Sequence, residues 1–231
     1  MKIVKPSATL EGLQLPVALV VGKDGKSRVK VLSHFPEKLV EKAARTCYKS
    51  DLDKDGNPVP PKKMTVRTAR KFIKMLRKCK HDAMLEFGDI IIRLVTDRGV
   101  SHEMVRMRLC SFAQESTRYC DYSRNKHGKE ITVIRPHFKH PAAGIIWERL
   151  QKRSEEAYFA LRALGEPPEL ARSVLTNSLK TELVVKANTR EWAWIKNLRA
   201  ALTAHPQMRE VMAPVVNILM TVAPSIFEEM R

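Results

Sequence analysis

Hydrophobic residues spaced three and four positions apart predict several amphipathic helices. The strongest pattern covers Thr65–Lys80, where apolar side chains recur at helical spacing and lysines and arginines lie opposite them. The same spacing predicts helices at Pro36–Tyr48, Gly99–Arg108, Gly144–Leu164 and Glu169–Leu175. The C-terminal third of the chain is therefore expected to be mostly helical.

Shorter runs rich in valine, isoleucine and threonine predict strands. Residues 1–22 have this character, and further strands are expected at Asp89–Thr96, Glu130–Ile134 and Thr181–Ala187. Within the first 22 residues the clearest strands are Lys2–Val4 and Leu15–Val21, before a turn at 23–26, and the Pro- and Gly-rich segment Ser50–Lys63 is expected to be a surface loop. Neither a β-α-β alternation nor a G-x-G-x-x-G motif is present, so the predicted fold class is α+β, with residues 1–231 in a single domain.

The formal net charge is +17. The positive electrostatic field of such a protein attracts small phosphates and polyanions alike. A nucleic-acid partner therefore stays open as a rival interpretation. The basic residues are spread along the whole chain, however, and no known nucleic-acid-binding module accompanies them, so this partner is disfavoured. No signal-like segment and no apolar run of about 20 residues is present, which predicts a cytoplasmic protein without a membrane span.

The four cysteines are expected to be free thiols. They form no C-x-x-C pair and have no histidine at zinc spacing, so no metal site is predicted at Cys47, Cys79, Cys110 and Cys120.

The segment from Arg106 to Tyr119 carries the clearest candidate chemistry. Three arginines and two serines lie within these fourteen residues, and a guanidinium suits phosphate or carboxylate better than an ammonium does. Gln114 and Glu115 offer groups that read the edge of a heterocycle, and Phe112 offers a flat surface for a ring. This mixture indicates a nucleotide.

The spacing of this segment resembles the signature of the flavin-dependent thymidylate synthases: Arg-His-Arg, seven residues, Ser, then Arg-Tyr. Arg106 and Arg108 take the two arginine positions, Ser116 the serine, and Arg118 with Tyr119 the closing pair. The stretches A-R-T-C-Y-K-S, H-D-A-M-L-E, A-R-S-V-L, N-T-R-E-W and N-L-R align with the same family, so the resemblance covers about 43–229.

The resemblance implies a role for each aligned residue. Arg199 falls on the arginine that binds the pyrimidine and favours its ionised form, which is the catalytic role. The implied dUMP-binding residues are Glu103, Met104, Arg106, Gln114, Glu115, Ser116, Thr117, Arg118 and Arg172. The implied FAD-binding residues are His81, Ala83, Arg106, Met107, Arg108, Asn188, Arg190, Trp194 and His205.

Four positions depart from the family pattern on its flavin side. Met107, Phe87 and Trp194 stand where the family has histidine, and Ala193 stands where it has arginine. Loss of these donors predicts looser FAD binding, which restoring histidine at 107 and 87 should tighten. Alternatively, the aromatic residues form a repacked site for flavin or another cofactor.

The resemblance implies an enzyme that methylates dUMP to dTMP, with methylenetetrahydrofolate as carbon donor, NADPH as reductant and FAD as hydride carrier. It also implies a homotetramer with active sites shared between subunits. Two other functions stay open: a diverged relative with a changed flavin, carbon donor or substrate, and a binding protein without catalysis.

Overall fold

The computed structural model describes residues 1–13, 18–21, 27–30, 35–50, 54–55, 57 and 65–228. Parts of the predicted strand Leu15–Val21 and of the loop Ser50–Lys63, together with the turn at 23–26, lie outside the described residues.

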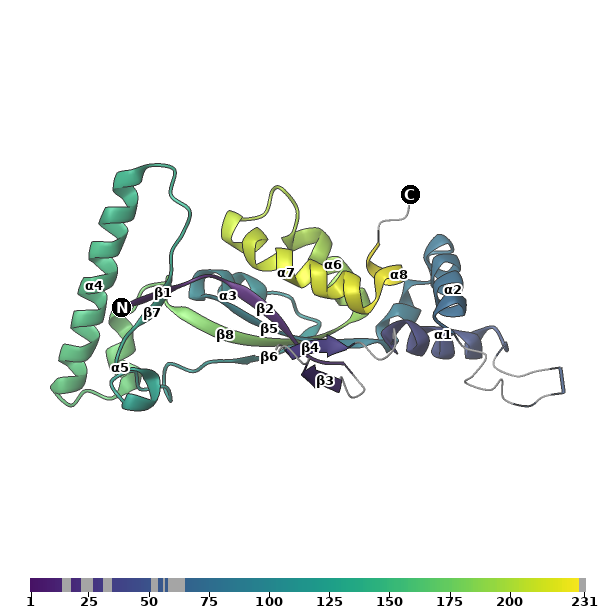
Figure 1. Ribbon diagram of the computed structural model, residues 1–231, viewed down its shortest axis with the longest axis horizontal. Coiled ribbons are helices and arrows are strands. Elements are labelled where there is room, and N and C mark those ends of the chain that lie inside the picture. Colours follow the sequence, from purple (N-terminus) through teal and green to yellow (C-terminus); the bar gives the residue numbers. More distant parts are fainter. Residues whose placement is uncertain are drawn as a thin grey trace.

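A four-stranded antiparallel sheet occupies the middle of the molecule (Figure 1). Its order is β2 (Ser7–Leu13), β5 (Asp89–Asp97), β8 (Lys180–Asn188) and β6 (Cys110–Gln114). Buried residues alternate with partly exposed ones along β5 and β8, as expected when one face of a sheet is covered. The strands predicted at Asp89–Thr96 and Thr181–Ala187 are confirmed.

Two smaller strand pairs accompany this sheet. β1 (Lys2–Val4) pairs in parallel with β7 (Thr132–Ile134), and β3 (Ala18–Val21) pairs antiparallel with β4 (Ser27–Lys30). The strand predicted at Glu130–Ile134 thus begins two residues later than expected.

Helices lie at both ends of the sheet and over one face (Figure 1). α1 (Phe35–Cys47) and α2 (Val66–Lys78) pack together at one end, while α4 (Pro141–Ala163) and α5 (Pro168–Ala171) lie at the other. α6 (Thr189–Arg199) and α7 (Pro206–Val222) contact the sheet, and α8 (Pro224–Phe227) follows them. The remaining turns are α3 (Arg98–Met104) and the 3-10 helices η2 (Asp82–Phe87), η3 (Asn125–His127) and η4 (Arg172–Val174).

Apolar side chains gather in two separate clusters. The main core packs the sheet against the helices around it and includes Ile90, Leu183, Trp192 and Val215. The second core lies at the α4 end and consists of Tyr122, Ile131, Val133, Trp147, Tyr158, Ala171 and Leu179. The α+β class is confirmed. Among the described residues, no helix is long and apolar enough to cross a membrane.

Several predicted boundaries are wrong, each for a local reason. The helix predicted at Gly99–Arg108 ends at Met104, since the chain turns there to enter β6, a strand that the arginine-rich sequence conceals. α4 begins at Pro141 rather than Gly144, because His140 caps it and proline suits the first turn. The helix predicted at Glu169–Leu175 is instead α5 followed by η4.

Candidate functional site

A cavity of about 580 Å³ opens where three segments meet: the turn after α3, the end of η2, and the junction of β8 with α6. Its lining combines guanidinium groups, carboxylates, an amide and an indole. The lining residues are Glu86, Arg106, Arg108, Leu109, Asn188, Arg190, Glu191 and Trp194. Five of these eight are residues that the sequence assigned to flavin, so the fold brings that group together.

The start of α6 is held firmly beneath this cavity. Asn188 caps the helix, its Oδ1 accepting the Glu191 backbone N–H at 2.8 Å. Thr189 bonds to the η2 region through its backbone N–H, which donates to the Gly88 carbonyl at 2.7 Å, and through its hydroxyl, which donates to the Leu85 carbonyl. Trp192 is fully buried and donates to the Ile90 carbonyl at 3.0 Å, whereas Trp194 is 52% exposed. The helix therefore presents Trp194 at the rim.

A second cavity, of about 610 Å³, adjoins the first through Arg190. It is lined by Cys47, Tyr48, Lys80, His81, Asp82, Ala83, Met84 and Arg190. Arg190 pairs with Glu86 at 2.5 Å between the two cavities. His81 Nδ1 lies 2.5 Å from the Tyr48 hydroxyl, so the tyrosine fixes the imidazole. Sequence reasoning did not name Tyr48 as a site residue, although it lies in the aligned stretch A-R-T-C-Y-K-S.

Arg106 and Arg108 are exposed at the first cavity. Neither forms an ion pair within the described part of the chain. Their donors, the plane of Trp194 and the remaining amide donors of Asn188 fit a flavin nucleotide, because an aromatic ring and an anionic phosphate need these two kinds of surface. His205, also assigned to flavin, precedes α7 and does not line either cavity.

Two methionines of the predicted site are in the main core. Met104 is fully buried, and Met107 is 4% exposed. Their side chains do not face either cavity, so only their backbone groups are available to a ligand. Phe87 is exposed but lines neither cavity, and Ala193 packs against the main core.

Arg199 at the end of α6 is held by Glu103 of α3. Its Nη2 donates to the Glu103 carbonyl at 2.8 Å and its Nη1 lies 3.3 Å from Glu103 Oε2. Its Nε is buried and has no hydrogen-bond partner among the residues that the structure describes. Sequence spacing placed Glu103 beside Arg106, and the Arg106 backbone N–H donates to the Glu103 carbonyl at 3.3 Å. The Glu103 carboxylate itself pairs with Arg199.

The turn at 114–118 is built on a polar network. Gln114 donates to Ser101 Oγ at 2.9 Å and to Thr181 Oγ1 at 3.2 Å. Glu115 accepts hydrogen bonds from the Tyr122 hydroxyl at 3.0 Å and from Lys180 at 3.1 Å. Both side chains are thus engaged in fixing the turn.

Arg172 joins this turn from the α4 end. Its Nη1 donates to Thr117 Oγ1 at 3.0 Å. Ser116 Oγ accepts the Arg118 backbone N–H at 3.3 Å, and the Arg118 guanidinium lies over the exposed Tyr119 ring, 5.4 Å from its centre. The structure therefore brings Arg172 to the turn at 114–118, which we call the signature turn. Arg199 is held separately by Glu103.

A buried carboxylate connects α3 to the start of α7. Asp97 Oδ1 caps α3 through the Val100 N–H at 2.7 Å, and Asp97 Oδ2 accepts Gln207 Nε2 at 2.7 Å. Burial raises the pKa of Asp97, and the nearby His205 opposes that rise. Asp97 thereby fixes the segment that carries His205.

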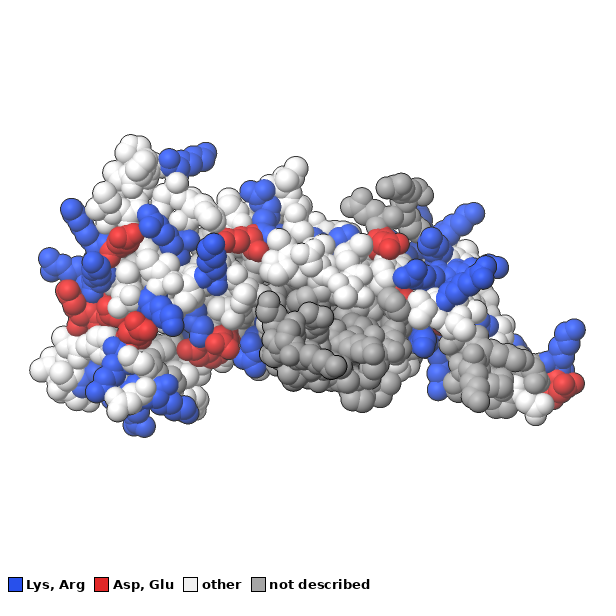
Figure 2. Space-filling model, viewed as in Figure 1, with Lys and Arg blue, Asp and Glu red and all other residues white. Residues whose placement is uncertain are grey.

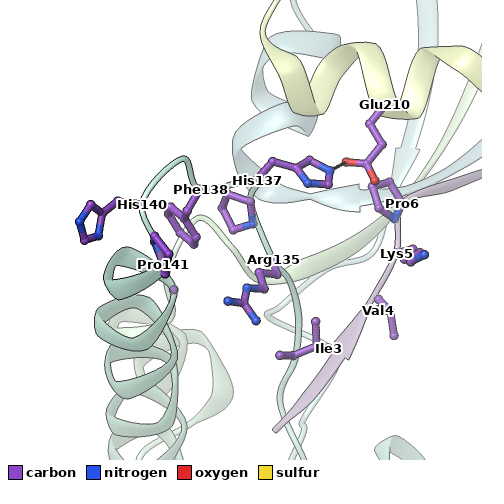
Figure 3. A pocket seen from close by; sticks show the side chains of 12 residues that line it. Ile3, Val4, Lys5, Pro6, Arg135, His137, Phe138, His140, Pro141 and Glu210 are labelled. Carbon is purple, nitrogen blue, oxygen red and sulfur yellow. Dashed lines mark hydrogen bonds and ion pairs between the residues drawn. The ribbon is translucent and has the colours of Figure 1, made fainter.

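A third cavity, of about 500 Å³, lies elsewhere, between β1, the segment after β7 and the first turn of α4 (Figure 3). Two of its side chains are paired: Arg135 with Glu148 at 2.8 Å, and His137 with Glu210 at 3.1 Å. It contains no residue of the predicted site.

The cysteines show no metal or nucleophile arrangement. All are free, and the described residues contain no group of histidine, cysteine and carboxylate side chains able to hold a metal. Burial, with a contribution from the charge of Glu191, raises the pKa of Cys110 to about 12, so this thiol stays protonated at neutral pH.

Comparison with known proteins decides the family. The family model described as thymidylate synthase complementing protein matches residues 30–225. The chain belongs to this family. A flavin-dependent thymidylate synthase of Geobacter sulfurreducens is 27% identical over 207 residues, covering 87% of this chain and 86% of the relative. One of Corynebacterium aurimucosum is 30% identical over 213 residues, covering 84% and 79%. The predicted membership of an enzyme family, the flavin-dependent thymidylate synthases, is thereby confirmed.

Proposed function

We propose that this protein methylates dUMP to dTMP reductively, taking the carbon from methylenetetrahydrofolate, the reducing equivalents from NADPH, and using FAD as the hydride carrier. The observation that carries the proposal is the cavity that gathers Arg106, Arg108 and Arg190 beside Trp194. Family membership supports the same reaction.

On the flavin side, guanidinium groups and an indole do the binding. Arg106, Arg108 and Arg190 would hold the anionic groups of the cofactor, and Trp194 offers its ring to a flat partner. Asn188, His81, Ala83, the backbone of Met107 and His205 are proposed to complete this side. FAD, when bound, supplies hydride transfer.

On the nucleotide side, Arg199 is the proposed catalytic residue. Glu103 orients its guanidinium, and a guanidinium placed at the pyrimidine stabilises negative charge developing on the ring. Carbon C5 then becomes nucleophilic without a covalent thiol, in agreement with the protonated state of Cys110.

The phosphate and sugar of dUMP are assigned to the signature turn and to Arg172. Arg118 is an exposed residue of this turn, and Arg172 of η4 donates to Thr117 of the same turn. Glu103, Met104, Arg106, Gln114, Glu115 and Ser116 complete the proposed nucleotide set. In a homotetramer, this turn would meet the flavin cavity of a neighbouring chain.

A direct assay tests the reaction. Purified protein is incubated with dUMP, methylenetetrahydrofolate, NADPH and FAD, and dTMP is quantified by liquid chromatography, omitting each component in turn. We expect dTMP only in the complete mixture. Absence of dTMP from that mixture, with folded protein, contradicts the proposal.

Arg199→Gln tests the catalytic assignment. Because the substitution removes the charge that opposes the developing anion, kcat should fall at least about 100-fold. Arg149→Gln, which removes one exposed arginine on α4, is the matched control and should retain full activity. Comparable activity in the two variants would refute the role of Arg199.

Calorimetry separates nucleotide binding from flavin binding. Since the nucleotide residues are present, dUMP should bind at about micromolar concentrations without added flavin. Absence of heat up to millimolar dUMP would count against the assignment of Arg118 and Arg172.

A further inference from the structure

The outer face of α2 carries a continuous row of positive charge. Five exposed residues three or four apart share this face, and we call them the α2 basic face: Arg67, Arg70, Lys71, Lys74 and Lys78. The helix contains no aspartate or glutamate. Figure 2 shows lysine and arginine side chains gathered over the end of the molecule that α2 occupies in Figure 1.

These charges have no partners within the part of the chain that the structure describes. Neighbouring arginines that face inward do have them: Arg45 pairs with Glu41 at 2.6 Å, and Arg77 donates to the Glu228 carbonyl at 2.7 Å. Like charges one turn apart repel, as between Arg67 and Lys71 or between Lys74 and Lys78. A bound polyanion would relieve that repulsion.

Other features hold α2 in place despite the repulsion. Thr65 and Thr68 form a reciprocal capping box at its start, and Ala69, Ile73 and Leu76 are buried. The helix is therefore a fixed support that presents its basic side chains to solvent. Loss of those side chains should not unfold it.

The shape of the basic face favours a nucleic acid over a membrane. From Arg67 to Lys78 the row extends about 16 Å, at 1.5 Å per residue, which spans several phosphates of a nucleic-acid backbone. A helix that binds a lipid surface inserts its apolar face. Here the apolar face of α2 is buried in the main core, and its described residues include no exposed large hydrophobic side chain.

We propose that the α2 basic face binds the sugar–phosphate backbone of nucleic acid without base specificity, as a second activity of this protein. None of its five residues lines the three cavities described above. The wide spread of basic residues along the sequence argued against a nucleic-acid partner. The fold adds to that picture that five of them are exposed together on one face of α2.

Fluorescence anisotropy with a labelled DNA of about 20 nucleotides, single-stranded and as a duplex, tests the proposal. The wild type should bind with a log–log salt slope of about −3.5 for the single strand and about −4.5 for the duplex, as expected for five phosphate contacts. A variant with Arg67→Gln, Arg70→Gln, Lys71→Gln, Lys74→Gln and Lys78→Gln should bind at least tenfold more weakly, with a shallower slope.

The matched control removes the same charge from exposed positions at the other end of the molecule: Lys126→Gln, Lys139→Gln, Arg149→Gln, Lys152→Gln and Arg153→Gln. It should stay within about threefold of the wild type. Equal weakening of both variants would assign binding to overall charge and overturn the proposal. Failure of the wild type to bind DNA at 50 mM salt, or capture by phosphatidylserine vesicles instead of DNA, would also overturn it.

Two measurements keep the result interpretable. Thermal unfolding and dUMP calorimetry should be unchanged in the α2 variant, because its residues are exposed and lie outside the proposed active site. If the variant with five substitutions unfolds, a double variant with Lys71→Gln and Lys74→Gln replaces it. The control is then the double variant with Lys152→Gln and Arg153→Gln. The reduced variant should still lower DNA affinity more than its control, and equality would overturn the proposal.

Discussion

Met107 packs in the main core with 4% of its surface exposed, whereas Phe87 is 51% exposed. Both stand where related enzymes are expected to have histidine, and the sequence alone treats them as the same loss of a donor. Burial separates them. An imidazole at 107 would have to be placed among apolar side chains, while one at 87 would meet water.

Met107→His should therefore lower the free energy of unfolding by about 2–4 kcal/mol, through burial of a polar ring. Phe87→His is the control and should change it by less than about 1 kcal/mol. Urea unfolding of both variants at pH 7 gives the comparison. Equal stability of the two variants would show that residue 107 does not lie in the core.

Asp121 ties the chain after the signature turn to α4. Arg162 Nη2 and Nε donate to its two carboxylate oxygens at 2.8 and 3.1 Å, and Ser123 adds a hydroxyl donor at 2.6 Å. The hydrogen bonds from Arg162 hold the pKa of Asp121 well below its usual range, with further lowering from Ser123.

Asp121→Asn should cost about 2 kcal/mol of unfolding free energy at pH 7, because it removes charge-assisted hydrogen bonds. The folded-state pKa is lower than the unfolded value of about 3.9, so the contribution is complete above that value and is lost as pH falls through the folded pKa. The difference between wild type and variant should be constant from pH 7 to about 5 and shrink below about pH 4. Urea unfolding across this range measures it, and a constant difference down to pH 3 would contradict the assignment.

At the scale of elements, two glycines differ in what surrounds them. A Cβ added at Gly88, between η2 and β5, would lie 2.9 Å from Thr189 Cγ2 and 3.1 Å from Pro36 Cβ. One added at Gly144 in α4 would meet only the end of the Arg135 side chain, which is exposed and can swing away. The first contact joins three packed segments beside the cavities.

Gly88→Ala should accordingly destabilise the protein by about 1–3 kcal/mol, by forcing apart α1 and the start of α6. Gly144→Ala should be neutral or stabilise by up to about 1 kcal/mol, since alanine favours a helix. Differential scanning calorimetry of the two variants tests the contrast. A smaller loss of stability in Gly88→Ala than in Gly144→Ala would refute this prediction.

Elements with a clear period were predictable, and those set by their neighbours were not. The runs rich in isoleucine, valine and threonine that form β5 and β8 are visible in the sequence, as is the apolar stripe of α2. β6 was missed because its five residues, Cys110–Gln114, form an edge strand whose pairing with β8 depends on a partner about 70 residues away in sequence. The pairing of Arg199 with Glu103 was missed for the same reason. Motif spacing grouped five residues that the fold brings to one cavity, namely Arg106, Arg108, Asn188, Arg190 and Trp194, and their assignment to flavin stays a prediction.

At the scale of the whole molecule, large apolar side chains remain on the surface. On α4 and after it these include Ile145, Ile146, Leu150, Leu164 and Leu170. Leu109, before β6, and Tyr119, after the turn that follows β6, are exposed as well. Exposed apolar surface of this extent is typical of proteins that associate. It agrees with the homotetramer that the family resemblance implies, which stays a proposal.

Light scattering coupled to size-exclusion chromatography should give a mass of four chains. Ile146→Glu combined with Leu150→Glu places two charges on the exposed face of α4 and should shift the protein to a smaller species, if this face is an interface. Lys126→Glu with Lys139→Glu, at exposed positions outside α4, is a control for added acidic charge. A monomer in the wild type would contradict the shared active site.

The two hydrophobic clusters have a consequence for local unfolding. The proposed flavin cavity rests on the main core, through Trp192 and Leu85, while Arg172 and Thr117 lie beside the second core. Small packed clusters open more readily than large ones, so we expect the proposed phosphate side of the site to have its own local folding equilibrium. A nucleotide that binds this side in its closed state lowers the population of the open state. Nucleotide binding should then slow amide hydrogen exchange in α4 and α5, at a distance from the reacting carbon.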